Sequence, residues 1–284
     1  MSSSDITARI QRLFVYPIKS CAGVELAEAV LTETGLDLDR AWMVVDAHGE
    51  FVTQRELPRM ALIRPQLKVH EVVLRAPGML ALHLQIDAVE EPARVRIWSD
   101  LVSAFDMGPI AAQWFSDFLG RPLRLVRFDP EYRRLSSRQW TDGVDALNQF
   151  SDGFPLLVLS QASLDLFNEK RISGGHAPVG MERFRPNLVL SGLHAHDEDR
   201  VALLEIFAAV PVLLKPVKPC SRCPIPDIDP LTAEIDPAVG GTLRSYRGNE
   251  RLNGAVSFGM NLIIVQGVDQ TLKVGQTVTA DFQF

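Results

Sequence analysis

The densest group of chemically reactive residue types in the chain is the heptapeptide at 218–224, KPCSRCP. Two cysteines separated by two residues can ligate a structural zinc ion, form a redox-active thiol pair, or supply one thiolate to a soft metal centre. Lys218 and Arg222 place positive charge beside the thiols, which favours the thiolate form. The segment therefore predicts thiol or metal chemistry around Cys220 and Cys223.

Four interpretations of this segment stay open on the residues alone. A structural zinc site needs four ligands, and beyond this pair the chain offers Cys21, with His194 and His196 as further candidates. A thioredoxin-like pair would need a flanking βαβ pattern, which the neighbouring sequence lacks. A single thiolate ligand and a pair of loop cysteines without a role are the other two.

Two further segments carry residue types that bind phosphate. In 16–23, YPIKSCAG, Lys19 and Ser20 stand at the end of an apolar run and before a glycine, where charge, hydroxyl and backbone donors can hold a phosphate. Arg185 and Asn187 offer a planar fork and a two-way amide, which suit a phosphate and a heterocycle edge. Arg40 is a further candidate for binding phosphate. The alternatives are a solvated lysine, a turn asparagine and exposed arginines.

Composition excludes several other classes. The 284 residues carry a net charge of −6, which disfavours non-specific nucleic-acid binding. Three cysteines argue against a disulfide framework and favour a cytoplasmic location. The start of the chain lacks the apolar run of a signal peptide, and the longest uncharged apolar run, 206–214, is too short to span a membrane. No Walker loop, G-x-G-x-x-G or G-x-S-x-G occurs.

The elements that must position these residues are mostly short strands. In the first half, apolar segments separated by turn residues predict strands at 10–18, 24–33, 40–46, 50–54, 67–74, 80–86, 95–97 and 121–128, with one helix at 110–119 that ends at Gly120. This spacing is typical of a sandwich or barrel. The polar stretch 129–152 is interpreted as a linker.

The second half alternates strands with one helix. Strands are expected at 155–160, 187–190, 258–266 and 272–280, and a helix at 161–170 with Ser160 as its N-cap. An apolar segment at 201–216 is kinked at Pro211, and the proline-rich 217–230 is expected to be a stiff loop.

The order of the motifs along the chain resembles one known family. The chain carries, in this order, YPIKSCAG, DLDRAW, RFRPN, KPCSRC followed after five residues by DP, and LRSYR. This series resembles the MOSC family, and most of all its branch with the mitochondrial amidoxime-reducing component and the bacterial YcbX proteins. The resemblance covers nearly the whole chain. It implies a mostly β (α+β) fold with a barrel core and a few short helices, an N-terminal MOSC-associated β-barrel region over 1–127, and a MOSC domain over 128–284.

The resemblance also implies a molybdenum cofactor in the cleft between the two parts. Cys223 matches the family's molybdenum ligand, and the other cofactor-binding positions carry over to Lys19, Ser20, Arg40, Arg185, Asn187, Ser221 and Arg222. Asn261 stands where relatives have a tyrosine, and residues 153–155, GFP, stand where relatives have Thr-Ser-Pro, so a contact at 153–155 would have to use the backbone.

The implied activity is the reduction of small N-hydroxylated compounds. Three cysteines are too few for an iron–sulfur cluster, so electrons are expected from a separate ferredoxin, flavoprotein or cytochrome. The resemblance leaves one alternative, a non-catalytic carrier of the cofactor or of sulfur. No nucleic-acid partner and no membrane span are expected.

Overall fold

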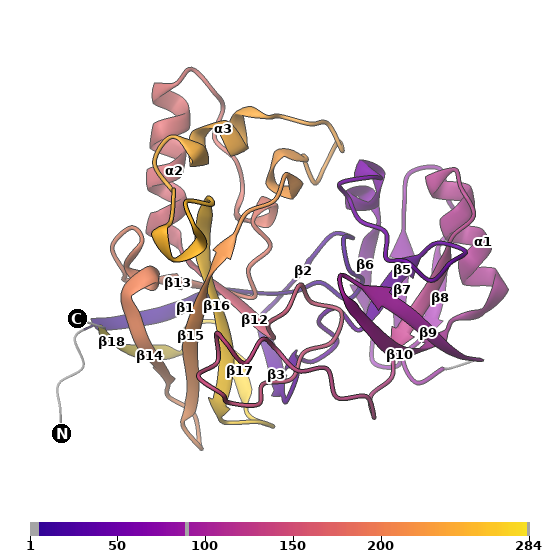
Figure 1. The fold of residues 1–284 in the computed structure, drawn as a ribbon, viewed down its shortest axis with the longest axis horizontal. Helices are drawn as coiled ribbons and strands as arrows, with labels where there is room; N and C mark the ends of the chain where they lie inside the picture. The colour runs from indigo at the N-terminus through magenta and orange to yellow at the C-terminus, as the bar shows by residue number, and fades with distance from the viewer. Residues whose placement is uncertain (1–5, 89–90, 283–284) are drawn as a thin grey trace.

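The computed structural model describes residues 6–88 and 91–282. Seven strands close into a barrel in the order β13-β12-β16-β15-β14-β18-β1, and the pairing of β1 with β13 completes the ring. The barrel occupies one end of the molecule (Figure 1). Its strands are β1 (Ile6–Val15), β12 (Leu156–Ser160), β13 (Leu188–Ser191), β14 (Val201–Ile206), β15 (Val212–Ser221), β16 (Ser257–Gln266) and β18 (Thr277–Phe282), with β2 (Val24–Leu26) beside β1.

A bulge in β1 decides which side chains face the barrel interior. Ala8 and Ile10 are buried in the barrel core, but the register against β13 shifts between Ile10 and Arg12, and Leu13 and Val15 then face the core. The extra residue changes the parity of the alternation. Phe14 therefore packs in a separate aromatic cluster outside the barrel.

The same change of parity places Tyr16, the residue after β1, in that outer cluster. The rings of Phe14 and Tyr16 are stacked, with centroids 6.4 Å apart.

Two helices cover one side of the barrel. The strands β12 and β13 are parallel, and α2 (Gln161–Ser173) forms the crossover between them. α3 (Ala238–Arg244) packs beside α2 (Figure 1). The sequence pattern did not predict the helix α3.

The other end of the molecule holds smaller sheets. A four-stranded antiparallel sheet has the order β5-β11-β10-β9, and its strands are β5 (Trp42–Val45), β11 (Arg124–Phe128), β10 (Asp100–Asp106) and β9 (Glu91–Ile97). α1 (Gly108–Leu119) packs against β11. A three-stranded sheet of β6 (Arg64–Leu67), β7 (Glu71–Arg75) and β8 (Leu82–Gln85) packs in the same core as α1. β3 (Glu28–Thr32), β4 (Gly35–Leu36) and β17 (Thr271–Lys273) form another small sheet, which lies beside the barrel and packs into its core (Figure 1).

The predicted mostly β fold and both predicted helices are confirmed. Gly120 terminates α1 and has φ +79°. Ser160 is the N-cap of α2, and its hydroxyl accepts a hydrogen bond from the Ser163 amide at 3.1 Å. The boundary at 127/128 stays a prediction, and the sheet pairing joins β1 to strands of the C-terminal half. No helix within the described ranges is long and apolar enough to cross a membrane.

The predicted loop at 217–230 is wrong in its first part, because β15 continues to Ser221. Its pairing with β16 shifts register between Pro216 and Lys218 and again between Pro219 and Ser221. Bulges of this kind absorb prolines that cannot donate to a regular ladder. The strand therefore carries the cysteine motif directly out of the barrel wall.

The predicted linker 129–152 is instead packed into the structure. Arg134 is buried and donates hydrogen bonds to the Asn148 amide oxygen at 2.8 Å and to the carbonyl oxygens of Gln149 and Ser151 at 2.6 and 2.7 Å. These bonds hold the end of the segment against the site described next.

Candidate functional site

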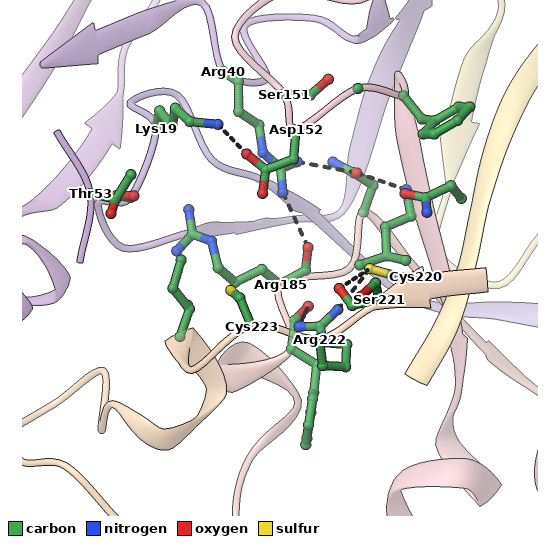
Figure 2. A pocket seen from close by; sticks show the side chains of 18 of the residues that line it. Lys19, Arg40, Thr53, Ser151, Asp152, Arg185, Cys220, Ser221, Arg222 and Cys223 are labelled. Atoms are coloured by element: carbon green, nitrogen blue, oxygen red, sulfur yellow. Dashed lines mark hydrogen bonds and ion pairs between the residues drawn. The ribbon is translucent and has the colours of Figure 1, made fainter. Parts of the chain in front are cut away.

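All nine residues predicted to form the site line one cavity of about 110 Å³. Figure 2 shows Lys19 and Arg40 on one side of it and the 220–223 segment on the other. The nine are Lys19, Ser20, Arg40, Arg185, Asn187, Ser221, Arg222, Cys223 and Asn261.

The cavity lies where an end of the barrel meets the loops before β5. Lys19 follows β1, and its backbone amide donates to the Trp42 carbonyl at 2.8 Å. Arg185 lies between η2 (Met181–Arg183) and β13. Asn261 lies in β16, paired with Lys218 of β15. Residues far apart in sequence are therefore brought together by the closure of the barrel.

Lys19 is buried, 6% exposed, and its ammonium group is held from two sides. Its Nζ donates to the Phe150 carbonyl at 2.8 Å and to Asp152 Oδ1 at 2.5 Å. Burial, with the charges of Arg134 and Arg40, lowers the pKa of Lys19 despite the opposing effect of Asp152. Desolvation opposes ionisation of Asp152, yet the charge and hydrogen bond of Lys19 hold its pKa well below the usual range, and 62% of its side chain stays exposed. The two groups form a close ion pair at the cavity wall.

Arg40 and Arg185 both stack on the ring of Tyr16. Their guanidinium carbons lie 4.3 and 4.2 Å from its centroid. The Tyr16 hydroxyl donates to the Pro186 carbonyl at 3.1 Å, and burial raises the pKa of this phenol. Burial and the charge of Arg40 lower the pKa of Arg185 to about 10.

Each of these arginines also contacts protein oxygen atoms. Arg40 forms an ion pair with Asp39 and donates to Asn187 Oδ1 at 3.2 Å. Arg185 donates to the Cys21 carbonyl at 2.7 Å. These contacts fix where both guanidinium groups lie.

Three of the cavity residues hold an unfavourable backbone conformation. Ser20, Arg40 and Arg185 have φ of +67°, +53° and +58°. For a residue with a Cβ this left-handed conformation costs about 1 kcal/mol or more, and such strain is concentrated at functional sites. Hydrogen bonds to the backbone of Ser20 and from the side chains of Arg40 and Arg185 hold these three residues in place.

The cysteine motif presents its two thiols differently. Cys220 accepts a hydrogen bond from Arg222 at 3.0 Å, and the other terminal nitrogen of Arg222 donates to the Phe184 carbonyl at 2.9 Å. Both thiols are partly exposed and line the cavity, but no hydrogen bond to Cys223 is seen in the described part of the chain. The Nε of Arg222 is buried and has no hydrogen-bond partner among the described residues. The positive charge of Arg222 at the cavity wall is suited to an anionic ligand.

The two asparagines have distinct environments. Asn187 is buried and its side chain is already used, since Oδ1 accepts from the Leu157 amide at 3.1 Å and Nδ2 donates to the Phe14 carbonyl at 3.2 Å. Asn261 is partly exposed and donates to the Lys218 carbonyl at 3.2 Å. Asn187 thus ties β1 to β12 and supports Arg40.

Asp152, Thr53 and Arg55 are among the cavity residues that the sequence did not indicate. Asp152 lies in the segment predicted to be a linker. Thr53 falls in the predicted strand 50–54, where the structure has only isolated bridges at Glu50 and Phe51, and Arg55 follows it. Arg55 donates to the Thr53 hydroxyl at 3.2 Å and stacks on Trp98, 4.7 Å from the ring centroid. No local signal identifies them, because their position depends on chain segments distant in sequence.

The cavity wall carries a strong excess of positive charge. Five cationic side chains and one carboxylate line it, a formal excess of four; the cations are Lys19, Arg40, Arg55, Arg185 and Arg222. Such a wall, with hydroxyl groups and a thiol, fits a phosphorylated ligand that also offers a metal for the thiolate.

The zinc interpretation of the cysteine pair is not supported. No group of three or more His, Cys, Asp or Glu side chains suited to a metal occurs in the parts of the chain that the structure describes. Cys21 is buried, and desolvation raises the pKa of its thiol to about 12. It therefore stays a thiol and does not join the pair.

Two family models match successive parts of this chain. Residues 7–122 match the MOSC N-terminal beta barrel domain, and residues 145–279 match the MOSC domain. Human mitochondrial amidoxime reducing component 2 is 35% identical over 248 residues, which cover 84% of this chain and 72% of that protein. The mouse component 1 is 36% identical, over 84% of this chain and 71% of that protein.

A second kind of relative matches over a smaller part of its own length. Human molybdenum cofactor sulfurase is 27% identical over 271 residues, which cover 89% of this chain and 30% of that protein. The domain matches, together with the extent of the first two relatives, establish that the chain belongs to the MOSC family, with a MOSC N-terminal beta barrel domain followed by a MOSC domain.

Proposed function

We propose that the cavity binds a molybdenum cofactor through Cys223 and that the chain reduces small N-hydroxylated compounds. The observation that carries the proposal is the meeting of all nine predicted residues in one positively charged cavity that contains a partly exposed thiol. The names of the amidoxime-reducing relatives support the substrate class.

The residues of the cavity divide into three tasks. Lys19, Ser20 and Arg40 supply charge and donors for the phosphate, and an anion there would oppose the lowering of the Lys19 pKa that burial and the nearby arginines cause. Arg185 and Arg222 add positive charge to the wall of the same cavity. Ser221 and Asn261 add polar groups at the rim, and Asn187 positions Arg40.

Cys223 is the metal ligand in this proposal, since Cys220 is engaged with Arg222 and Cys21 is buried. When bound, the cofactor supplies the two-electron chemistry, and the protein supplies thiolate, charge and orientation. The overall reaction is R–NHOH + 2 electrons + 2 protons → R–NH₂ + H₂O, in which the N–O bond breaks and nitrogen is reduced.

The electrons come from a separate donor protein of ferredoxin, flavoprotein or cytochrome type. The three cysteines of the sequence are fewer than the four ligands of an iron–sulfur cluster. A cytoplasmic location belongs to the same proposal.

The first test is metal and pterin analysis of protein from a host that makes the cofactor. About one molybdenum and one pterin per chain are expected, followed by turnover of hydroxylamine with reduced viologen as donor. Stoichiometric zinc without pterin would contradict the cofactor assignment. Adding the cofactor back distinguishes an empty preparation from a protein that cannot bind it.

The relationship to molybdenum cofactor sulfurase supports a second candidate, a non-catalytic carrier of cofactor or sulfur. A carrier would hold the cofactor yet give no turnover with viologen and hydroxylamine. The same assay therefore separates the two functions.

A further inference from the structure

A second cavity of about 670 Å³ adjoins the cysteine cavity. Arg185 and Ile225 line both cavities, so the two meet at these residues. Ile225 lies two residues after Cys223, which limits their Cα separation to about 7 Å. A molecule in the second cavity can therefore reach the region of the thiol.

Much of the wall of this second cavity is apolar. β2 contributes Val24, the start of β6 contributes Pro65, and the segment after η4 (Ile225–Asp227) contributes Ile228 and Leu231. Leu231 is 68% exposed and contributes to the wall of the cavity. The volume is in the range of small-molecule sites.

The acidic side chains of the wall are already paired with arginines. Glu25 and Glu182 both accept hydrogen bonds from Arg12, at 2.8 and 2.6 Å. Asp229 accepts from Arg183 at 2.7 Å. The acidic groups of the wall are therefore paired within the protein, and the wall offers a ligand its apolar surface together with the exposed side chain of Arg64.

We propose that this second cavity binds the uncharged alkyl or aryl body of the substrate while its N–O group lies toward Cys223. The inference rests on the proposed reductase function and adds its substrate preference. A phosphorylated cofactor fits the first cavity, where positive charge is in excess. The second cavity stabilises a ligand by burying its apolar surface. The chain should thus prefer N-hydroxylated compounds with a substantial apolar group to hydroxylamine itself.

A substrate series tests the preference. The kcat/KM values for hydroxylamine and for N-methyl-, N-butyl- and N-hexylhydroxylamine are compared with reduced viologen as donor. Burial of each methylene should raise kcat/KM about threefold to fourfold until the cavity is filled. A flat series with good turnover of hydroxylamine would overturn the second cavity as substrate site and leave the reductase function standing.

Leu231 and Ile235 provide a matched pair of variants. Both are large exposed aliphatic residues of one loop, 68% and 61% exposed, but only Leu231 contributes to the described wall of the cavity. Leu231→Asp should lower the ratio of kcat/KM for N-hexylhydroxylamine over hydroxylamine at least tenfold, and Ile235→Asp should keep the wild-type ratio. Equal ratios in the two variants would overturn the assignment.

A binding measurement covers the case in which no turnover is found. N-hydroxybenzamidine is added to the cofactor-loaded protein without an electron donor, and backbone amide shifts are followed by NMR. Shifts at Val24 and Leu231 that vanish in Leu231→Asp support the second cavity as the substrate-body site even if the reductase assay fails. No shifts, or shifts confined to the α2–α3 groove around Leu166 and Thr242, would overturn it.

Discussion

Arg40 donates a hydrogen bond to the carbonyl oxygen of Arg185 at 3.2 Å, although 145 residues separate the two in sequence. Both side chains stack on Tyr16, and both backbones have positive φ. Two like charges on one buried ring repel each other, and burial with the charge of Arg40 lowers the pKa of Arg185. An anion between or beside them would relieve this repulsion, which is the physical basis for the binding site.

Lys19→Ala should weaken cofactor retention. Loss of one charge-assisted contact to phosphate corresponds to about a tenfold to hundredfold loss of affinity. Pterin content after gel filtration measures it. Asp152→Asn is the matched control, since it removes the partner carboxylate and leaves the ammonium group for the ligand. Equal pterin loss in both variants would argue against the phosphate role of Lys19.

Cys223→Ser should lose most of the bound molybdenum and the activity. The side chain is partly exposed, so the free energy of unfolding should change by no more than about 0.5 kcal/mol. Cys220→Ser should lose less molybdenum and less activity, because that thiol accepts a hydrogen bond from Arg222 and is not the proposed ligand. Metal analysis of the two proteins decides, and full molybdenum content in Cys223→Ser would refute the assignment.

Tyr16 should contribute to stability mainly through its ring. Tyr16→Phe removes the hydrogen bond to the Pro186 carbonyl and should lower the free energy of unfolding by about 1 kcal/mol. Tyr16→Leu also removes the stacking surface of both arginines and should cost about 3 kcal/mol. Urea unfolding measures both changes. A larger effect of the phenylalanine variant would contradict this division.

His196 should make the protein sensitive to acid. Burial, with the charges of Arg247 and Lys170, lowers its pKa from 6.5 to about 4. The folded protein thus binds the proton less well than the unfolded chain. The stabilising contribution is complete above about pH 6.5 and is lost as the pH falls toward 4.

The variant His196→Asn isolates this contribution, because asparagine tolerates the positive φ of +68° at this position. The free energy of unfolding is measured for both proteins at pH 7, 6, 5 and 4. As the pH falls from 7 to 4, the free energy of unfolding of the wild type should decrease more than that of the variant. A difference that is constant with pH would show that His196 is not the titrating group.

Several features of this protein could be predicted from local sequence chemistry alone. Ser160 caps α2 and Gly120 ends α1 because capping hydroxyls and left-handed glycines act within one turn of chain. The strand-rich pattern predicted the fold class, and the motifs identified nine residues that the structure brings to one cavity. Side-chain types and short-range order are contained in the sequence itself.

Only the tertiary structure decided the rest. Asp152 reaches Lys19 across 133 residues because Arg134 packs a segment that looked like a linker. β15 continues through Pro219 because bulges against β16 accommodate the missing donors. Cys21 is excluded from the site by burial. Each of these depends on contacts with other segments of the folded chain, and such contacts leave no periodic or local signal in the sequence.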